Sequence, residues 1–160
     1  MELLKNLKKQ RAELDKKIET LEYAERVFEE GDQIWFVDHF GNVECGKWGN
    51  FAWVDGAFNQ GHIFRTKKEA ETEAKRRNLL TRFRSFRDEC NDRWKPDWNN
   101  EDKKWNIRYM ENSFLTELAF ESNSFSTFGC FKNEEDAQRA IDLFGDEIKE
   151  LFVDCEECEW

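Results

Sequence analysis

The 160-residue chain has few of the residues that interrupt or cross-link a fold. It contains one proline and eight glycines, which excludes collagen-like and low-complexity classes. Its apolar runs are only a few residues long, whereas a membrane span needs about 20 apolar residues, so we expect no transmembrane helix. The first residues are charged and lack the apolar stretch of a signal peptide, so we expect no export.

Histidine and recognisable catalytic motifs are also scarce. With two histidines, acid–base chemistry would fall on carboxylates, and no spacing singles out a pair. The sequence has no glycine-rich phosphate loop, no Gly-x-Ser-x-Gly and no His-Glu-x-x-His motif. We therefore expect a protein that is not an enzyme, with no catalytic residue, metal or cofactor. Five cysteines without an export signal favour free thiols in a reducing cytoplasm.

Charge is abundant but uneven. The chain has 25 basic and 35 acidic residues, a net of −10, which argues against broad nucleic-acid binding because phosphates need Lys and Arg. With 15 Phe and 7 Trp it is too aromatic to be disordered. Residues 62–94 hold 10 basic and 6 acidic groups, a net of +4. Residues 133–160 hold 2 and 11, a net of −9, so the excess acid is concentrated there.

A long N-terminal helix is predicted over residues 2–30, which contain no Gly or Pro, with Gly31 as its stop. Apolar residues recur at heptad positions, with a complete d row and a half-polar a row that includes Arg11 and Glu25. Three interpretations remain open: a dimerising coiled coil, a helix whose stripe packs on its own domain, or a helix that binds another partner. The oligomerisation residues would be Leu4, Leu7, Leu14, Ile18, Leu21 and Phe28.

An internal repeat organises the remaining chain. The phrases 64–70 and 131–137 align at an offset of 67, and each places a polar cap and then an acid after an aromatic residue. The predicted fold is α+β, with the N-terminal helix followed by two repeated units of small antiparallel sheet plus helix. The expected segments are helix 1–30, first unit 31–92, linker 93–103, second unit 104–152 and acidic tail 153–160.

Local patterns refine this outline. Thr66 and Glu69 fit a capping box, and Asn133 with Asp136 gives a weaker one. Alternation over 105–131 predicts a three-stranded meander with a turn at 111–113. Glycines break the aromatic stretch 46–58 into loops. The helix from 67 to about 90 changes its apolar face partway, as expected of a strut that joins the two halves.

A basic cluster on this helix is the first candidate site. Its members do not form one stripe on a helical wheel. They fit a solvated helix whose charges pair with the acidic C-terminal segment, an anion or nucleic-acid site, or a surface for an acidic protein. The cluster comprises Lys75, Arg76, Arg77, Arg82, Arg84 and Arg87.

The acidic segment with nearby aromatics is the second candidate. It is either a solubilising face or a negative surface that occupies a basic groove on a partner in place of nucleic acid. The residues expected to contact a partner are Asp142, Asp146, Glu147, Glu150, Asp154, Glu156, Glu157, Trp48 and Trp53.

The pair Cys155 and Cys158 has the spacing of half a zinc site or of a redox motif. No second pair completes a zinc site, and an acidic tail is not the βαβ context of a redox motif. Free thiols are therefore favoured, with a metal shared across a dimer as the alternative.

The motif Trp94-Lys95-Pro96-Asp97-Trp98-Asn99, together with the Phe64–Glu71 phrase, resembles a group of small proteins from phages and prophages of Firmicutes. The resemblance covers most of residues 31–152, and its motifs are architectural, so it implies no active site. The acidic end and the Cys-x-x-Cys depart from that pattern. Phage origin implies, by analogy, a stoichiometric inhibitor of host defence, of which anti-CRISPR proteins are one kind.

Three functions follow as expectations. The first is a cytoplasmic phage protein in an infected bacterium that binds a host protein, such as a CRISPR or other defence nuclease, through its acidic surface. The second is a sponge for a nucleotide signal that uses the Arg cluster for phosphates and Trp for bases. The third is a coiled-coil assembly module, with homodimerisation through the N-terminal helix. Neither membrane contact nor direct nucleic-acid binding is expected.

Overall fold

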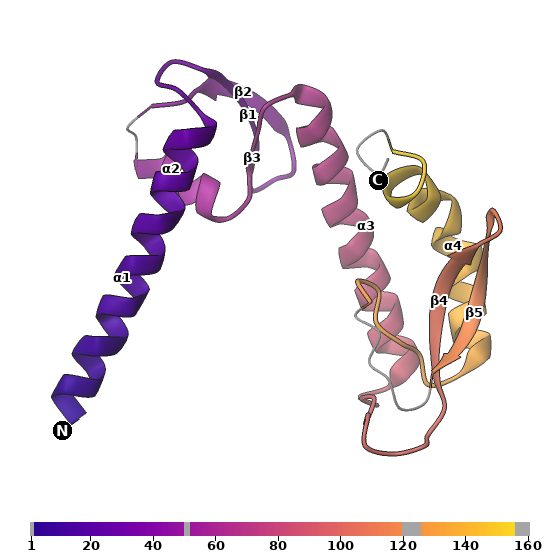
Figure 1. Ribbon diagram of the computed structural model, residues 1–160. Coiled ribbons are helices and arrows are strands. Elements are labelled where there is room, and N and C mark those ends of the chain that lie inside the picture. The colour runs from indigo at the N-terminus through magenta and orange to yellow at the C-terminus, as the bar shows by residue number, and fades with distance from the viewer. Residues whose placement is uncertain (1, 50–51, 120–125, 156–160) are drawn as a thin grey trace. The chain divides into compact units, whose positions relative to one another are not determined.

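The computed structural model describes residues 2–49, 52–119 and 126–155 (Figure 1). The fold is α+β, as the sequence predicted, and it divides into a first unit, residues 1–74, and a second unit, residues 75–160. In chain order the elements are α1 (Glu2–Val27), β1 (Gln33–Val37), β2 (Val43–Lys47), α2 (Ala52–Asn59), β3 (Ile63–Phe64), α3 (Lys67–Asn91), β4 (Lys104–Met110), β5 (Ser113–Ala119) and α4 (Glu134–Phe152).

The predicted N-terminal helix is present as α1, and Gly31 follows it with φ 93°. Only its C-terminal end packs against the first unit. Ala24 and the adjoining Phe28 are buried, whereas every residue from 2 to 19 is exposed. Among the described side chains, the interpretation that the apolar stripe folds back on its own domain therefore holds for Ala24 and Phe28, and not for the stripe residues up to Ile18.

The first unit packs its core against a three-stranded antiparallel sheet in the order β2-β1-β3. Phe28 stacks on Trp48 with ring centroids 4.8 Å apart, and the edge of Phe58 meets both rings. Sequence reasoning treated 46–58 as loops, but residues 52–59 form α2. Its buried Val54 and half-buried Ala57 and Phe58 have the spacing of one helical face, which Gly56 obscured.

The start of α3 confirms the predicted capping box. The Glu69 amide donates to Thr66 Oγ1 at 3.1 Å, and the Thr66 amide donates to Glu69 Oε2 at 3.1 Å. The weaker box at α4 differs, because Asn133 makes no side-chain cap bond to the backbone. Its Nδ2 donates instead to Asp136 Oδ2 at 3.1 Å.

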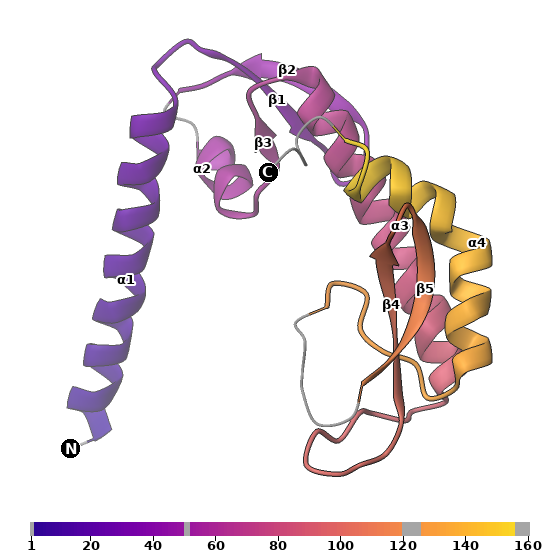
Figure 2. The same ribbon diagram turned by 45° about the vertical axis from the view of Figure 1, so that its right-hand side comes forward.

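The second unit consists of the β4–β5 hairpin, α4 and most of α3 (Figures 1 and 2). The hairpin turns at Glu111 and Asn112, whose φ angles of 53° and 64° suit a tight two-residue turn. Apolar side chains from α3 and α4 meet the hairpin beneath. The buried residues of this core are Leu79, Phe83, Phe131, Ala137, Ala140, Phe144, Ile148 and Leu151.

The internal repeat is visible as a shared pairing. In the first unit Phe64 of β3 pairs with Trp35 of β1, and α3 begins three residues later. In the second unit Phe131 forms an isolated antiparallel bridge with Trp105 of β4, and α4 begins three residues later. The third strand predicted to end at Phe131 is reduced, over residues 126–131, to this bridge, and residues 120–125 lie outside the described chain.

The division between the units differs from the segments expected from the sequence. It falls inside α3, between Ala74 and Lys75, because Leu79 and Phe83 are buried in the core that α4 helps to form. Residues 93–103 therefore connect α3 to β4 within the second unit and do not link two halves.

The capping box gives a stability prediction. Thr66→Ala removes the hydroxyl that accepts the Glu69 amide, so we expect the free energy of unfolding to fall by about 1 kcal/mol. Urea denaturation followed by circular dichroism measures it. Thr81→Ala, at an exposed site in the same helix, is the matched control and should change stability little. Equal losses in both variants would contradict the capping role.

Candidate functional site

The basic cluster on α3 is tied to α4 by ion pairs and hydrogen bonds. Lys75 Nζ lies 3.3 Å from Glu150 Oε1, and Arg82 makes a two-pronged contact with Glu147. The hydrogen bond with Glu147 raises the pKa of Arg82 above its ordinary value. The +4 and −9 segments thus partly neutralise each other within the second unit.

The other cationic members are directed to separate places. Arg76 Nε donates to the Leu151 carbonyl at 2.8 Å, and its guanidinium lies 5.4 Å from the centre of the Phe152 ring. Arg84 is exposed and Arg77 is half-buried. Since these side chains do not converge, the cluster as a whole does not form the anion site that was one interpretation of it. Arg87 alone of the six lines the cavity at the end of α3.

The acidic candidates are partly engaged. Asp154 lies 3.6 Å from Lys149 Nζ, and Asp142 accepts a hydrogen bond from Gln138 at 3.0 Å. Since Glu147 and Glu150 are paired with α3, this leaves Asp142 and Asp146 as exposed carboxylates for which the described residues supply no ion-pair partner. Glu156 and Glu157 lie outside the described residues.

The expectation that Trp48 offers an exposed surface to a partner is wrong. Trp48 is buried in the first-unit core against Phe28. Trp53 is about half exposed and rests its ring against Phe36 with centroids 5.2 Å apart. Both belong to the first unit, whereas the described acidic candidates belong to the second.

Some of the predicted oligomerisation residues are exposed and others are not. Leu4, Leu7, Leu14 and Ile18 are exposed on α1 and remain available. Phe28 was expected to share this role, but it is buried in its own unit, so it cannot serve a partner helix. The side chain of Leu21 lies outside the described ones.

Cys155 is disulfide-bonded, so the expectation of a free thiol there is wrong. Cys158 lies outside the described residues. Arg76 donates to Cys155 Sγ at 3.0 Å. The described residues contain no group of three or more His, Cys, Asp or Glu side chains arranged to hold a metal ion.

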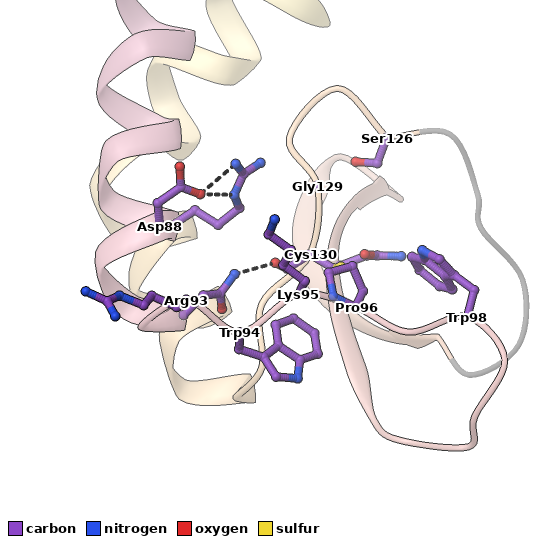
Figure 3. Close-up of a pocket in the computed structure, with 12 residues that line it drawn as sticks. Asp88, Arg93, Trp94, Lys95, Pro96, Trp98, Ser126, Gly129 and Cys130 are labelled. Carbon is purple, nitrogen blue, oxygen red and sulfur yellow. Dashed lines mark hydrogen bonds and ion pairs between the residues drawn. The ribbon is translucent and has the colours of Figure 1, made fainter.

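A cavity of about 790 Å³ lies where the end of α3 meets the loop to β4 and the segment before Phe131 (Figure 3). Sequence reasoning missed it, because the loop was interpreted as a linker. Its wall combines three kinds of group. The cations are Arg87, Arg93 and Lys95, the aromatic rings are Trp94 and Trp98, and the amides are Asn91 and Asn106.

The backbone at the end of α3 shapes one side of this cavity. Asp92 and Arg93 take φ angles of 40° and 64°, a left-handed conformation that costs free energy in residues other than glycine. The turn is closed by a hydrogen bond from the Trp94 amide to the Asn91 carbonyl, at 2.8 Å. The chain reverses there and brings Trp94, Lys95 and Pro96 to the cavity.

The Asn91 side chain fixes the opposite side. Its Nδ2 donates to the Cys130 carbonyl at 2.9 Å, and its Oδ1 accepts the Lys132 amide at 2.9 Å. Phe131, between them, exchanges two backbone hydrogen bonds with Trp105. Segment 130–132 is therefore hydrogen-bonded to β4 on one side and to the side-chain amide of Asn91 on the other. The amide donates and accepts as the backbone of a neighbouring strand would.

Lys104 supports the Trp98 wall from within. It is completely buried, and its ammonium donates to Asn100 O, Asn100 Oδ1 and Asp102 O at 3.2, 3.1 and 2.7 Å. These acceptors satisfy all three donors of the ammonium group. The same nitrogen lies 5.5 Å from the centre of the Trp98 ring, an arrangement that attracts cation to ring.

Gly129 leaves room for Arg87. Its φ is 70°, and a Cβ there would come 2.6 Å from Arg87 Nη1. That guanidinium donates to the Phe128 carbonyl at 3.0 Å and pairs with Asp88. Any larger residue at 129 would strain the backbone and displace the cation.

The chemistry of the cavity is that of binding. Burial raises the pKa of the Cys130 thiol, so it stays protonated at neutral pH and is a poor nucleophile. The carboxylate of Asp88 is held by Arg87. His39 and His62 belong to the first unit. Cations, indole rings and amides remain, and these suit an anion that carries a flat ring.

Comparison of the chain with protein families, curated proteins and solved structures gave no match in any of the three. Within the described ranges, none of the helices combines the length and apolar character of a membrane span. The function is therefore inferred from the cavity and the surfaces of the chain itself.

The buried ammonium gives a second prediction. Lys104→Met removes the ammonium donor from three carbonyl oxygens, of which Asn100 Oδ1 keeps the Asp102 amide, so we expect the free energy of unfolding to fall by about 1–3 kcal/mol. Lys103→Met, at the exposed neighbouring position, is the control and should change little. Urea titration of both proteins measures the difference. A Lys104→Met protein as stable as the control would show that the ammonium network contributes nothing.

Proposed function

We propose that the protein is a non-catalytic binding protein whose second-unit cavity takes a small anionic ligand with a flat ring, of the nucleotide class. The observation that carries the proposal is the combination of three cations and two indole rings around a cavity of about 790 Å³. Drug-sized and cofactor-sized ligands occupy cavities of about 300–1,000 Å³. The volume therefore suits a mononucleotide or a small cyclic dinucleotide.

Two of the cations are free to meet phosphate. Arg93 and Lys95 are exposed, and the described part of the chain supplies no ion-pair partner for either. They differ in this from Lys75 and Arg82, whose charges are already matched by α4. Charge-assisted bonds from such groups to phosphate are among the stronger polar contacts in proteins.

The indole rings offer a stacking surface for a base. Trp94 and Trp98 are both half-buried and lie on either side of Pro96 (Figure 3). Stacking of a base on an aromatic side chain contributes about 1–3 kcal/mol and tolerates any base. The net charge of −10 disfavours a long nucleic acid, so a small ligand in a local basic cavity is the better fit.

The expected biological setting is sequestration of a nucleotide signal in the cytoplasm of an infected bacterium. This setting depends on the resemblance to phage proteins and on the nucleotide-sponge hypothesis, with the phosphate contacts moved from the α3 cluster to the cavity. A protein that holds such a signal stoichiometrically would block a defence system without catalysis.

A thermal-shift and calorimetric panel tests the ligand class. Inorganic phosphate, mononucleotides and cyclic dinucleotides are the probes, and a true ligand raises the melting temperature by mass action. Lys95→Glu should weaken binding about 10- to 100-fold, since a charge-assisted bond contributes about 1.5–3 kcal/mol.

The matched control is Lys103→Glu, an exposed lysine that does not line the cavity and should leave affinity unchanged. Absence of any shift across the nucleotides, or equal losses in the two variants, would end the nucleotide proposal. A response to inorganic phosphate alone would remove the role of the indole rings.

A second candidate function is the acidic-surface inhibitor of a defence nuclease. Asp142 and Asp146 favour it, because both are exposed on α4 and neither has an ion-pair partner among the described residues. A negative patch would speed association with a basic groove and would be sensitive to salt.

One interference assay separates the two functions. Cells that carry a defence system and express the protein are challenged with phage. If the acidic surface acts, Asp142→Lys with Asp146→Lys abolishes protection and Lys95→Glu does not. If the cavity acts, the outcome is reversed. No protection by the unaltered protein would remove the anti-defence setting from both.

A further inference from the structure

The free part of α1 exposes an apolar stripe that Arg11 interrupts. All residues from 2 to 19 are exposed, yet large apolar side chains lie on the seam positions of the heptad pattern. Leu4, Leu7, Leu14 and Ile18 are exposed by 59%, 52%, 58% and 53%. An isolated helix gains little stability in water, and a row of large exposed apolar side chains on one helix face indicates an interaction site.

We propose that this stripe binds the same stripe of a second copy of the chain in an antiparallel orientation. In the proposed register, the numbers of two seam residues that lie opposite each other add up to 25. In this register Leu7 lies opposite Ile18, and Arg11 lies opposite Leu14. Leu4 comes opposite position 21. The proposal is independent of the ligand in the second-unit cavity.

Seam charges favour the antiparallel arrangement. In a parallel dimer each seam position meets its own copy, so Arg11 would face Arg11 and Glu25 would face Glu25, which is unfavourable for like charges. In the antiparallel register the stem of Arg11 covers Leu14, and its guanidinium stays within 3.8 Å of Asp15 on its own helix. Each seam layer then contains at least one apolar residue.

Charges beside the seam favour the same register. In an antiparallel pair, residues that flank the seam at the same heptad position lie next to each other across the interface. Lys8 of each copy then lies beside Asp15 of the other copy, which gives two such contacts in the dimer. A shift of one heptad would place Asp15 against Asp15. It would also require Phe28, which is buried in its own unit. In a parallel pair, the contact of Lys17 with Glu22 would be the only attractive contact between flanking charges. Arg11 would still face Arg11, and Glu25 would still face Glu25.

The extent of free helix matches the length of the overlap. The paired span, residues 4–21, ends before Ala24 and Phe28 enter the first-unit core. The overlap thus leaves the packing of Ala24 and Phe28 undisturbed. Each copy contributes six seam positions, one of which is Arg11. The interface is therefore short and contains two arginines, so the dimer should dissociate measurably on dilution.

A charge-swap cycle on the full chain tests the register. Sedimentation velocity over a dilution series gives the dissociation constant of the dimer. Asp15→Lys turns two attractive contacts into repulsive ones and should weaken the dimer about 10-fold. Lys8→Asp combined with Asp15→Lys should restore the constant to within about 2-fold of the original.

The rescue is specific to the antiparallel register. Both variants lose the Arg11–Asp15 contact within one helix, so that loss cannot explain recovery in the double variant. In a parallel pair Lys8 would face Leu3 and Asp15 would face Gln10, and no rescue would follow. The control exchanges the outward pair Lys9 and Glu13, 3.9 Å apart, and should leave the constant unchanged.

Leu14→Glu tests the seam itself. This variant should sediment with the mass of a single chain, and circular dichroism should confirm that the rest of its fold is intact. Monomeric wild-type protein at every concentration would overturn the proposal and assign the stripe to another partner. A dimer that the Asp15→Lys change does not weaken, or that the double variant does not recover, would overturn the register.

Discussion

Much of the second unit depends on how Phe131 is held. Its backbone exchanges two hydrogen bonds with Trp105, and the residues on either side of it are bound by the amide of Asn91. Its ring packs near Phe83 and Phe86. One residue thereby joins the hairpin, the end of α3 and the start of α4. The cavity lies against the same joint, because Asn91 and Cys130 also line it.

The repeat was predictable because its signal is local in sequence. Phe64 and Phe131 each precede a polar cap by two residues, and a capping box depends on neighbours three residues apart. The strand partner of each aromatic residue, Trp35 in one unit and Trp105 in the other, could not be predicted from the sequence. Each pair joins residues that are far apart in the sequence, so no local pattern indicates it. The helix α2 was missed for a simpler reason: Gly56 weakens a helical pattern that burial of Val54 supports.

The candidate sites show the same limit. Composition located the basic and acidic segments and offered their mutual pairing as one interpretation, and Lys75 with Glu150 bears that out. It could not separate the paired cations from Arg93 and Lys95, which have no ion-pair partner among the described residues. The Trp94–Trp98 motif was noticed as a resemblance, but its position beside a cavity follows from the left-handed turn at Asp92 and Arg93. Aspartate tolerates this conformation, but arginine rarely adopts it, so Arg93 hides the turn from sequence rules.

The helix α3 has a consequence for how the molecule folds. Its N-terminal cap and Ala70 belong to the first unit, whereas Leu79 and Phe83 are buried in the second. Helix formation is limited by the cost of its first turn, and each further residue adds with little penalty. Once either unit has ordered its part of α3, extension into the other proceeds from an existing end. A single nucleation event can therefore serve two hydrophobic cores, and the two units share a kinetic step although their interiors are separate.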